Sequence, residues 1–131
     1  MRNIDIFNLI TAEVFAASYE QFPVEISIVS EDMAQSIANY FPQDLHEEVV
    51  KNARESVFST VEWLGRSGYL YVKDQHDMGF GRVTLTPKAL ALLNQVPSSL
   101  QESIGSEMIK RAKEFSSIAL IESVKLMFSN S

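Results

Sequence analysis

Cysteine is absent from this chain of 131 residues, and glycine and proline are scarce, with five and four. The lack of cysteine excludes a disulfide framework, a thiolate zinc site, a cysteine nucleophile and thiol redox chemistry. With 46% apolar and 21% charged residues, the composition is typical of a globular protein rather than a disordered or fibrous one. At 14.7 kDa the chain has room for one domain, which can bury roughly two-thirds of the surface that its unfolded form exposes.

Long hydrophobic runs are also missing. The longest stretch without a charged residue is the 13-residue segment from Ala89 to Gln101, and it contains Pro97. It is too short and too polar to cross a bilayer. The first 19 residues carry Asp5 and Glu13 and lack the order of a secretory signal. We therefore expect a cytoplasmic protein without membrane contact.

Motifs for catalysis and for metal binding are incomplete or absent. His46-Glu47-Glu48 would need a second histidine at position 50 to form a zinc helix, and Val50 is there. The only other histidine, His76, belongs to another predicted element. No serine lies in a G-x-S-x-G elbow, and no glycine-rich phosphate loop is present. The sequence predicts that the protein is not an enzyme and holds no metal or cofactor.

The first half of the chain has the periodicity of three helices, with a short strand between the first two. We predict helices over residues 3–22, 31–41 and 44–67 and a strand over residues 24–28. Pro23 and Pro42 end the first two helices. Ser30 and Asp44 occupy the positions expected for the N-caps of the second and third. Gly68 is the expected left-handed residue that ends the third helix.

The third predicted helix is strongly amphipathic at 100° per residue. Its apolar face holds Val50, Ala53, Val57, Thr60, Val61 and Leu64. Its polar face holds Glu48, Lys51, Asn52, Glu55, Ser59, Glu62 and Arg66. Phe58 and Trp63 flank the apolar stripe, and we expect them to seal the edges of the core rather than bind a ligand.

The second half predicts a β-hairpin followed by helices. The predicted strands are residues 69–73 and 82–85, joined by a mobile polar tip over residues 74–81. Thr86-Pro87 is expected to cap a short helix that ends near residue 95, with Leu90 and Leu93 facing inward. A capping box of Ser98 and Gln101 is expected to open a last helical stretch over residues 99–128, bent near Gly105 or at Ser116-Ser117.

Two motifs beside the hairpin, taken with the order helix, strand, helix, helix, hairpin, resemble a known superfamily. Residues 63–70, Trp-Leu-Gly-Arg-Ser-Gly-Tyr-Leu, look like the end of the recognition helix in bacterial winged-helix regulators of the MarR and PadR type. Residues 85–90, Leu-Thr-Pro-Lys-Ala-Leu, resemble the signature after their wing, except that Ala89 stands where glycine is usual. The resemblance covers residues 4–95 and implies a mainly α, α+β fold. It would comprise a winged helix-turn-helix domain (residues 1–95) and a C-terminal helical extension (residues 96–131).

The resemblance also implies a DNA-binding transcriptional regulator. The candidate DNA contacts are Lys51, Asn52, Ser59 and Arg66 on the third helix and Lys73, His76 and Arg82 on the hairpin. The charge opposes this function, because the chain carries a net charge of −6 and the polar face of the third helix has more acids than bases. The alternative is a winged-helix module whose acidic surface binds protein and does not contact DNA. A continuous basic strip would favour DNA, whereas a mixed face with an exposed apolar patch elsewhere would favour protein.

The C-terminal segment predicts a helix that is apolar on most of its circumference, since eight of the eleven residues from 118 to 128 are apolar. Either the rest of the chain covers it on two sides or a second copy does. The families resembled commonly dimerise through terminal helices, so we expect a homodimer. Its expected interface is Ile118, Leu120, Ile121, Val124, Met127 and Phe128. A crevice between this segment and the first and third helices could take an apolar effector, which no residue pattern identifies.

Overall fold

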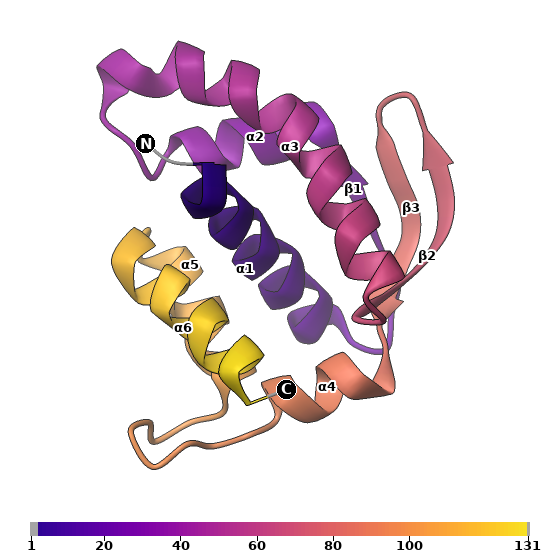
Figure 1. The fold of residues 1–131 in the computed structure, drawn as a ribbon, viewed down its shortest axis with the longest axis vertical. Coiled ribbons are helices and arrows are strands. Elements are labelled where there is room, and N and C mark those ends of the chain that lie inside the picture. Colours follow the sequence, from indigo (N-terminus) through magenta and orange to yellow (C-terminus); the bar gives the residue numbers. More distant parts are fainter. Residues whose placement is uncertain (1–2, 131) are drawn as a thin grey trace.

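Helices dominate the fold, and three short strands form one small sheet. The computed structural model describes residues 3–130. The elements in chain order are α1 (Asn3–Gln21), β1 (Ile26–Val29), α2 (Ser30–Ala38), the 3-10 turn η1 (Gln43–Leu45), α3 (His46–Arg66), β2 (Leu70–His76), β3 (Gly79–Leu85), α4 (Pro87–Leu93), α5 (Ile104–Lys113) and α6 (Ser117–Ser129) (Figure 1).

The sheet is antiparallel, with β3 between β1 and β2. Val83 in β3 lies opposite Ile26 in β1 and opposite Val72 in β2. Within residues 3–130, six α-helices and a three-stranded antiparallel sheet make an α+β fold that is compatible with a winged-helix layout.

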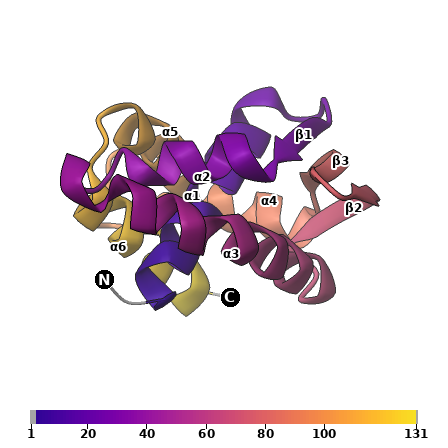
Figure 2. The same cartoon turned by 90° about the horizontal axis from the view of Figure 1, so that it is seen from above.

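Helix α1 forms the centre of the molecule. In two perpendicular views the sheet lies at one end and α5 and α6 lie at the other, with α1 between them (Figures 1 and 2). It packs against α3, α5 and α6. Its most deeply buried side chains are Ile6, Leu9, Ile10, Ala12, Val14 and Phe15. A helix covered on most sides is apolar around most of its circumference, which is the pattern of residues 3–22.

The predicted first and third helices are confirmed. Helix α1 ends at Gln21, two residues before Pro23. The predicted apolar face of α3 is buried over its whole length. Gly68 has a φ of 84° and ends α3 in the left-handed region, as expected.

The N-caps predicted for α2 and α3 are wrong. Ser30 is the first residue of α2, and its hydroxyl donates a 2.8 Å hydrogen bond to the backbone oxygen of Arg54 in α3. Asp44 lies inside η1, and α3 begins at His46 without a side-chain cap. Helix α2 ends at Ala38 rather than residue 41, because residues 39–41 continue as tighter turns with backbone bonds to the third residue before them.

The hairpin is longer and its tip shorter than predicted. Its strands extend to His76 and from Gly79, so only Asp77 and Met78 turn between them. Gly79 has a φ of 153°, and a Cβ atom there would lie 1.9 Å from the Ile28 backbone oxygen. This glycine therefore permits a close approach of β1 to β3 rather than a flexible tip.

The C-terminal helical stretch is two helices. The predicted capping box at Ser98 is wrong, since α5 begins at Ile104 and Ser103 is its N-cap, accepting a 3.1 Å hydrogen bond from the Ser106 amide. The predicted bend at Ser116-Ser117 corresponds to a break between the helices, where Phe115 has a φ of 52°. Gly105 lies within α5 and makes no bend.

The start of α4 is confirmed, with Thr86 as the cap that accepts from the Ala89 amide and Pro87 as the first residue. Leu93 is fully buried and Leu90 half-buried.

Within residues 3–130, no helix combines the length and the hydropathy needed to span a bilayer.

Candidate functional site

The exposed side of α3 carries a row of carboxylates. Glu48, Glu55 and Glu62 recur every seven residues, and a straight helix drifts by only about 20° per heptad. The three exposed side chains therefore follow nearly one line, which we call the acidic ridge. In the described part of the chain, Glu48 and Glu55 form no ion pair, and Glu62 accepts one long hydrogen bond of 3.5 Å from Gln75.

Two of the hairpin cations predicted to contact DNA already have carboxylate partners. The Arg82 guanidinium donates two hydrogen bonds to Asp74, of 2.8 and 3.0 Å, and holds the pKa of that carboxyl below its usual range. The Lys73 ammonium lies 2.7 Å from Glu25. Both cations are exposed but locally neutralised, so their attraction for phosphate is weakened.

The remaining predicted contacts do not form a basic strip either. His76 accepts a 3.3 Å hydrogen bond from the Met78 amide in the hairpin turn. Lys51 and Arg66 make no ion pair among residues 3–130, yet they are 15 residues apart along α3, and they line separate depressions on either side of the acidic ridge. Arg66 and Lys73 line a depression of about 330 Å³ between α3 and the hairpin.

Arg54, a further cation of α3, is also engaged. It donates to Glu31 at the start of α2, and this hydrogen-bonded pair lowers the pKa of Glu31 to about 2. With its four acids and three bases, α3 has a formal charge of −1, and the hairpin strands and their turn have two of each. The surface that would meet DNA is therefore mixed in charge.

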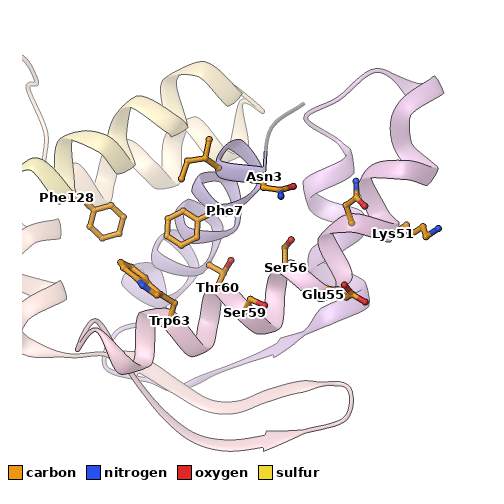
Figure 3. A pocket seen from close by; sticks show the side chains of 11 residues that line it. Asn3, Phe7, Lys51, Glu55, Ser56, Ser59, Thr60, Trp63 and Phe128 are labelled. Atoms are coloured by element: carbon orange, nitrogen blue, oxygen red, sulfur yellow. The ribbon is translucent and has the colours of Figure 1, made fainter.

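A groove of about 820 Å³ lies beside the acidic ridge, between the first turns of α1, the length of α3 and the end of α6 (Figure 3). Its lining residues are Asn3, Ile4, Phe7, Lys51, Asn52, Glu55, Ser56, Ser59, Thr60, Trp63 and Phe128. Three of the predicted DNA contacts, Lys51, Asn52 and Ser59, are thus placed on the wall of this groove.

One end of the groove is aromatic. The Trp63 ring meets Phe7 edge-on at 5.5 Å and Phe128 edge-on at 6.1 Å between centroids (Figure 3). Trp63 nevertheless keeps 42% of its surface exposed. Phe58, on the other flank of α3, packs against Phe80 at 5.4 Å and seals the core edge as predicted. Trp63 forms the wall of an open groove instead.

The rest of the groove is lined by short polar side chains. Ser56, Ser59 and Thr60 stand in the middle of α3 between Trp63 and Glu55 (Figure 3). Ser59 is exposed and Ser56 is half-buried, so their hydroxyls can reach a bound partner, whereas Thr60 is buried.

The six predicted interface residues of α6 have different surroundings. Leu120, Val124 and Met127 have no exposed surface, because α1 and α5 cover them within the chain. Ile121 and Phe128 are half-buried, and Ile118 is 79% exposed. The apolar circumference of α6 is thus largely covered by the chain's own helices.

A second titratable cluster links α1 to the turns that follow α2. The Tyr40 hydroxyl donates a 3.0 Å hydrogen bond to Glu13, and the Phe115 ring packs on Tyr40 at 5.6 Å. Burial raises the pKa of Glu13, and the hydrogen bond from Tyr40 opposes this in part.

Over residues 3–130, no group of three His, Asp or Glu side chains is arranged to hold a metal ion.

Comparisons with known proteins identify no relative: no family model matches the chain, and no curated protein or solved structure matches it. The groove was only partly visible in the sequence, which predicted a crevice between these helices but not the residues of the first helix that line it. The available signal was the position of Trp63 on the flank of the α3 stripe rather than at its centre.

Proposed function

We propose that the chain is a winged-helix domain that serves as a protein-interaction module and makes no DNA contact. The observation that carries this proposal is the acidic ridge on the exposed side of α3. In a winged-helix protein bound to DNA, this side of the third helix enters the major groove, between two rows of phosphates.

The electrostatic balance favours protein over DNA. Of the predicted cations, only Lys51 and Arg66 lack a carboxylate partner within the described residues. Two phosphate contacts correspond to a salt-dependence slope of about −2, whereas proteins that bind duplex DNA well make about six to ten such contacts. Three carboxylates in the same surface would repel the phosphates, so the balance is unfavourable.

The exposed apolar surface also supports protein binding. Ile4 and Trp63 are 51% and 42% exposed at the edge of the groove. Aromatic side chains are enriched at the centres of protein interfaces, where they supply much of the binding energy. A mixed charge on α3 and the hairpin together with this exposed patch supports the protein-binding alternative.

The test is a pull-down from lysate with the tagged full-length chain, with and without nuclease, and with the captured nucleic acid sequenced. We expect a protein partner that survives nuclease treatment and no enriched DNA. Enrichment of duplex fragments that then bind in fluorescence anisotropy, with a salt slope of several units reduced by Lys51→Ala and Arg66→Ala, would refute the proposal.

The predicted homodimer stays a prediction. The buried positions of Leu120, Val124 and Met127 leave Ile118 and the half-buried Ile121 as the main apolar surface of α6 for a second copy. Equilibrium sedimentation at micromolar concentration tests it, since a monomer has a mass of 14.7 kDa.

A further inference from the structure

We infer that the groove between α1, α3 and α6 binds a basic amphipathic helix of a partner protein. This inference rests on the proposed protein-binding function and assigns a surface and a partner chemistry to it. The geometry of the groove, the short side chains in its middle and the charges on its rim each support it.

The length of the groove suits a helix. Its wall on α3 runs from Lys51 to Trp63, and twelve residues at 1.5 Å each span about 18 Å. A partner helix of about the same number of residues would therefore lie along the whole groove. Such a helix presents its anchors at steps of three and four residues on one face.

The middle of the groove and its aromatic end would contact different parts of a bound helix. In the middle, Ser56, Ser59 and Thr60 are short, so a partner backbone can approach α3 closely (Figure 3). At one end, Trp63 and Phe7 stand beside Phe128 and offer an aromatic surface to a large apolar side chain. Partly exposed aromatic clusters of this kind are typical anchor sites in helix-binding grooves.

The rim of the groove selects a basic partner. Glu55 lines the groove, and Glu48 and Glu62 continue the acidic ridge one heptad to either side. A somewhat longer helix, of about 15 residues or more, with Lys or Arg every seven residues would place a cation opposite each carboxylate, at intervals of about 10 Å. Because Glu48 and Glu55 form no ion pair in the described residues, a partner would not have to displace an internal base from them.

The same ridge opposes the other occupants. A second copy placed with its own α3 in the groove would bring two rows of glutamates together, and like charges in contact are destabilising. Nucleic acid and anionic lipid carry the charge of the ridge and would be repelled. The basic amphipathic helix is the occupant that satisfies both the aromatic end of the groove and the acidic ridge beside it.

The probe is a labelled 18-residue peptide with leucines on one helical face and lysines on the other. One control peptide replaces every lysine by glutamate, and a second keeps the composition but scrambles the leucines off their common face. We expect the leucine–lysine peptide to raise fluorescence anisotropy at micromolar protein and both controls to bind at least about tenfold more weakly. Trp63 is the only tryptophan of the chain, so its emission should shift to shorter wavelength as the peptide covers it.

Two variants of equal charge separate the groove from the overall acidity. Glu55→Lys should weaken peptide binding at least about tenfold. Glu102→Lys, in the exposed loop between α4 and α5, changes the net charge by the same amount and should leave the dissociation constant within about twofold. Ile4→Asp tests the apolar wall at a half-exposed position, and its thermal melt shows whether the fold is kept.

Each outcome decides the matter. Equal losses with Glu55→Lys and Glu102→Lys, or equal binding of the scrambled peptide, would show charge attraction without a groove and overturn the inference. Self-association that buries Trp63 would assign the groove to a second copy and also overturn it. If no basic peptide binds while a nuclease-resistant partner is cross-linked to another face, the groove inference fails and the proposed function stands.

Discussion

Gly105 of α5 packs directly against the Tyr19 ring of α1, and replacing it by alanine tests that packing. A Cβ atom on Gly105 would lie 2.6 Å from two carbons of the Tyr19 ring and 2.8 Å from a third. Carbon atoms in contact are normally about 3.5–4.0 Å apart. The ring or the helix would therefore have to move by about 1 Å.

Displacing the Tyr19 ring would break the hydrogen bonds of its hydroxyl. The Tyr19 hydroxyl donates to the Asn94 side chain and lies 3.3 Å from the Ser103 hydroxyl. Losing two such hydrogen bonds costs about 1–3 kcal/mol. Alanine gains at most about 1 kcal/mol over glycine in a helix. With the full gain from alanine, the net result for Gly105→Ala is a destabilisation of up to about 2 kcal/mol, which lowers Tm by up to about 8 °C for a chain of this size.

Gly65→Ala is the matched control. This glycine also lies within a helix, α3, but the nearest atom to its Cβ position is a Val72 methyl carbon at 3.8 Å, an ordinary contact. It should therefore gain about 0.5–1 kcal/mol from helix propensity. Urea unfolding followed by circular dichroism measures the free energy of unfolding of both variants. If Gly105→Ala raised the midpoint as Gly65→Ala does, or if its cost were unchanged in a Tyr19→Leu background, the argument from the ring would be refuted.

Three further predictions concern single positions. Gly68→Val should cost about 1–3 kcal/mol, because a φ of 84° strains a β-branched residue even in the open space around it, and an unchanged urea midpoint would contradict this. Thr86→Ala should cost about 1–2 kcal/mol and Thr86→Ser much less, since the hydroxyl caps the Ala89 amide and also donates a 2.6 Å hydrogen bond to the Gly68 oxygen. Burial raises the pKa of Glu13, so the native state holds this proton more tightly, and stability falls as pH rises from the ordinary carboxyl range through the raised pKa. Glu13→Gln, which keeps an acceptor for the Tyr40 hydroxyl, should raise Tm more at pH 8 than at pH 4, and equal shifts would contradict the linkage.

Local chemistry accounts for the parts of the fold that the sequence predicted well. The periodicity of α1 and α3 reflects which side chains are buried, and burial decides where such helices lie. Gly68 and Thr86 act on backbone groups within a few residues of themselves. These features require no knowledge of the rest of the chain.

Contacts between distant segments account for what the sequence could not show. Serine is a residue type that commonly caps helices, but the Ser30 hydroxyl donates to the backbone oxygen of Arg54, 24 residues away. The sequence predicts Lys73 as a phosphate contact. In the structure β3 pairs with both β1 and β2, which brings Glu25 beside Lys73. Likewise the groove exists because Phe7 of α1 and Phe128 of α6, 121 residues apart in the sequence, both meet the Trp63 ring of α3.

The central position of α1 has a consequence for how the protein is made. The apolar side of α1 is completed by α5 and α6, which end at Lys113 and Ser129, so it stays uncovered while about a hundred further residues are synthesised. At about 5–20 residues per second that interval lasts roughly 5–20 s. During this time that side of α1 lacks the two helices that cover it, and we expect the nascent chain to be a client for chaperones on the ribosome. A fragment that stops at residue 95 would keep that exposure permanently, so its insolubility would reflect an unfinished core rather than a lost interface.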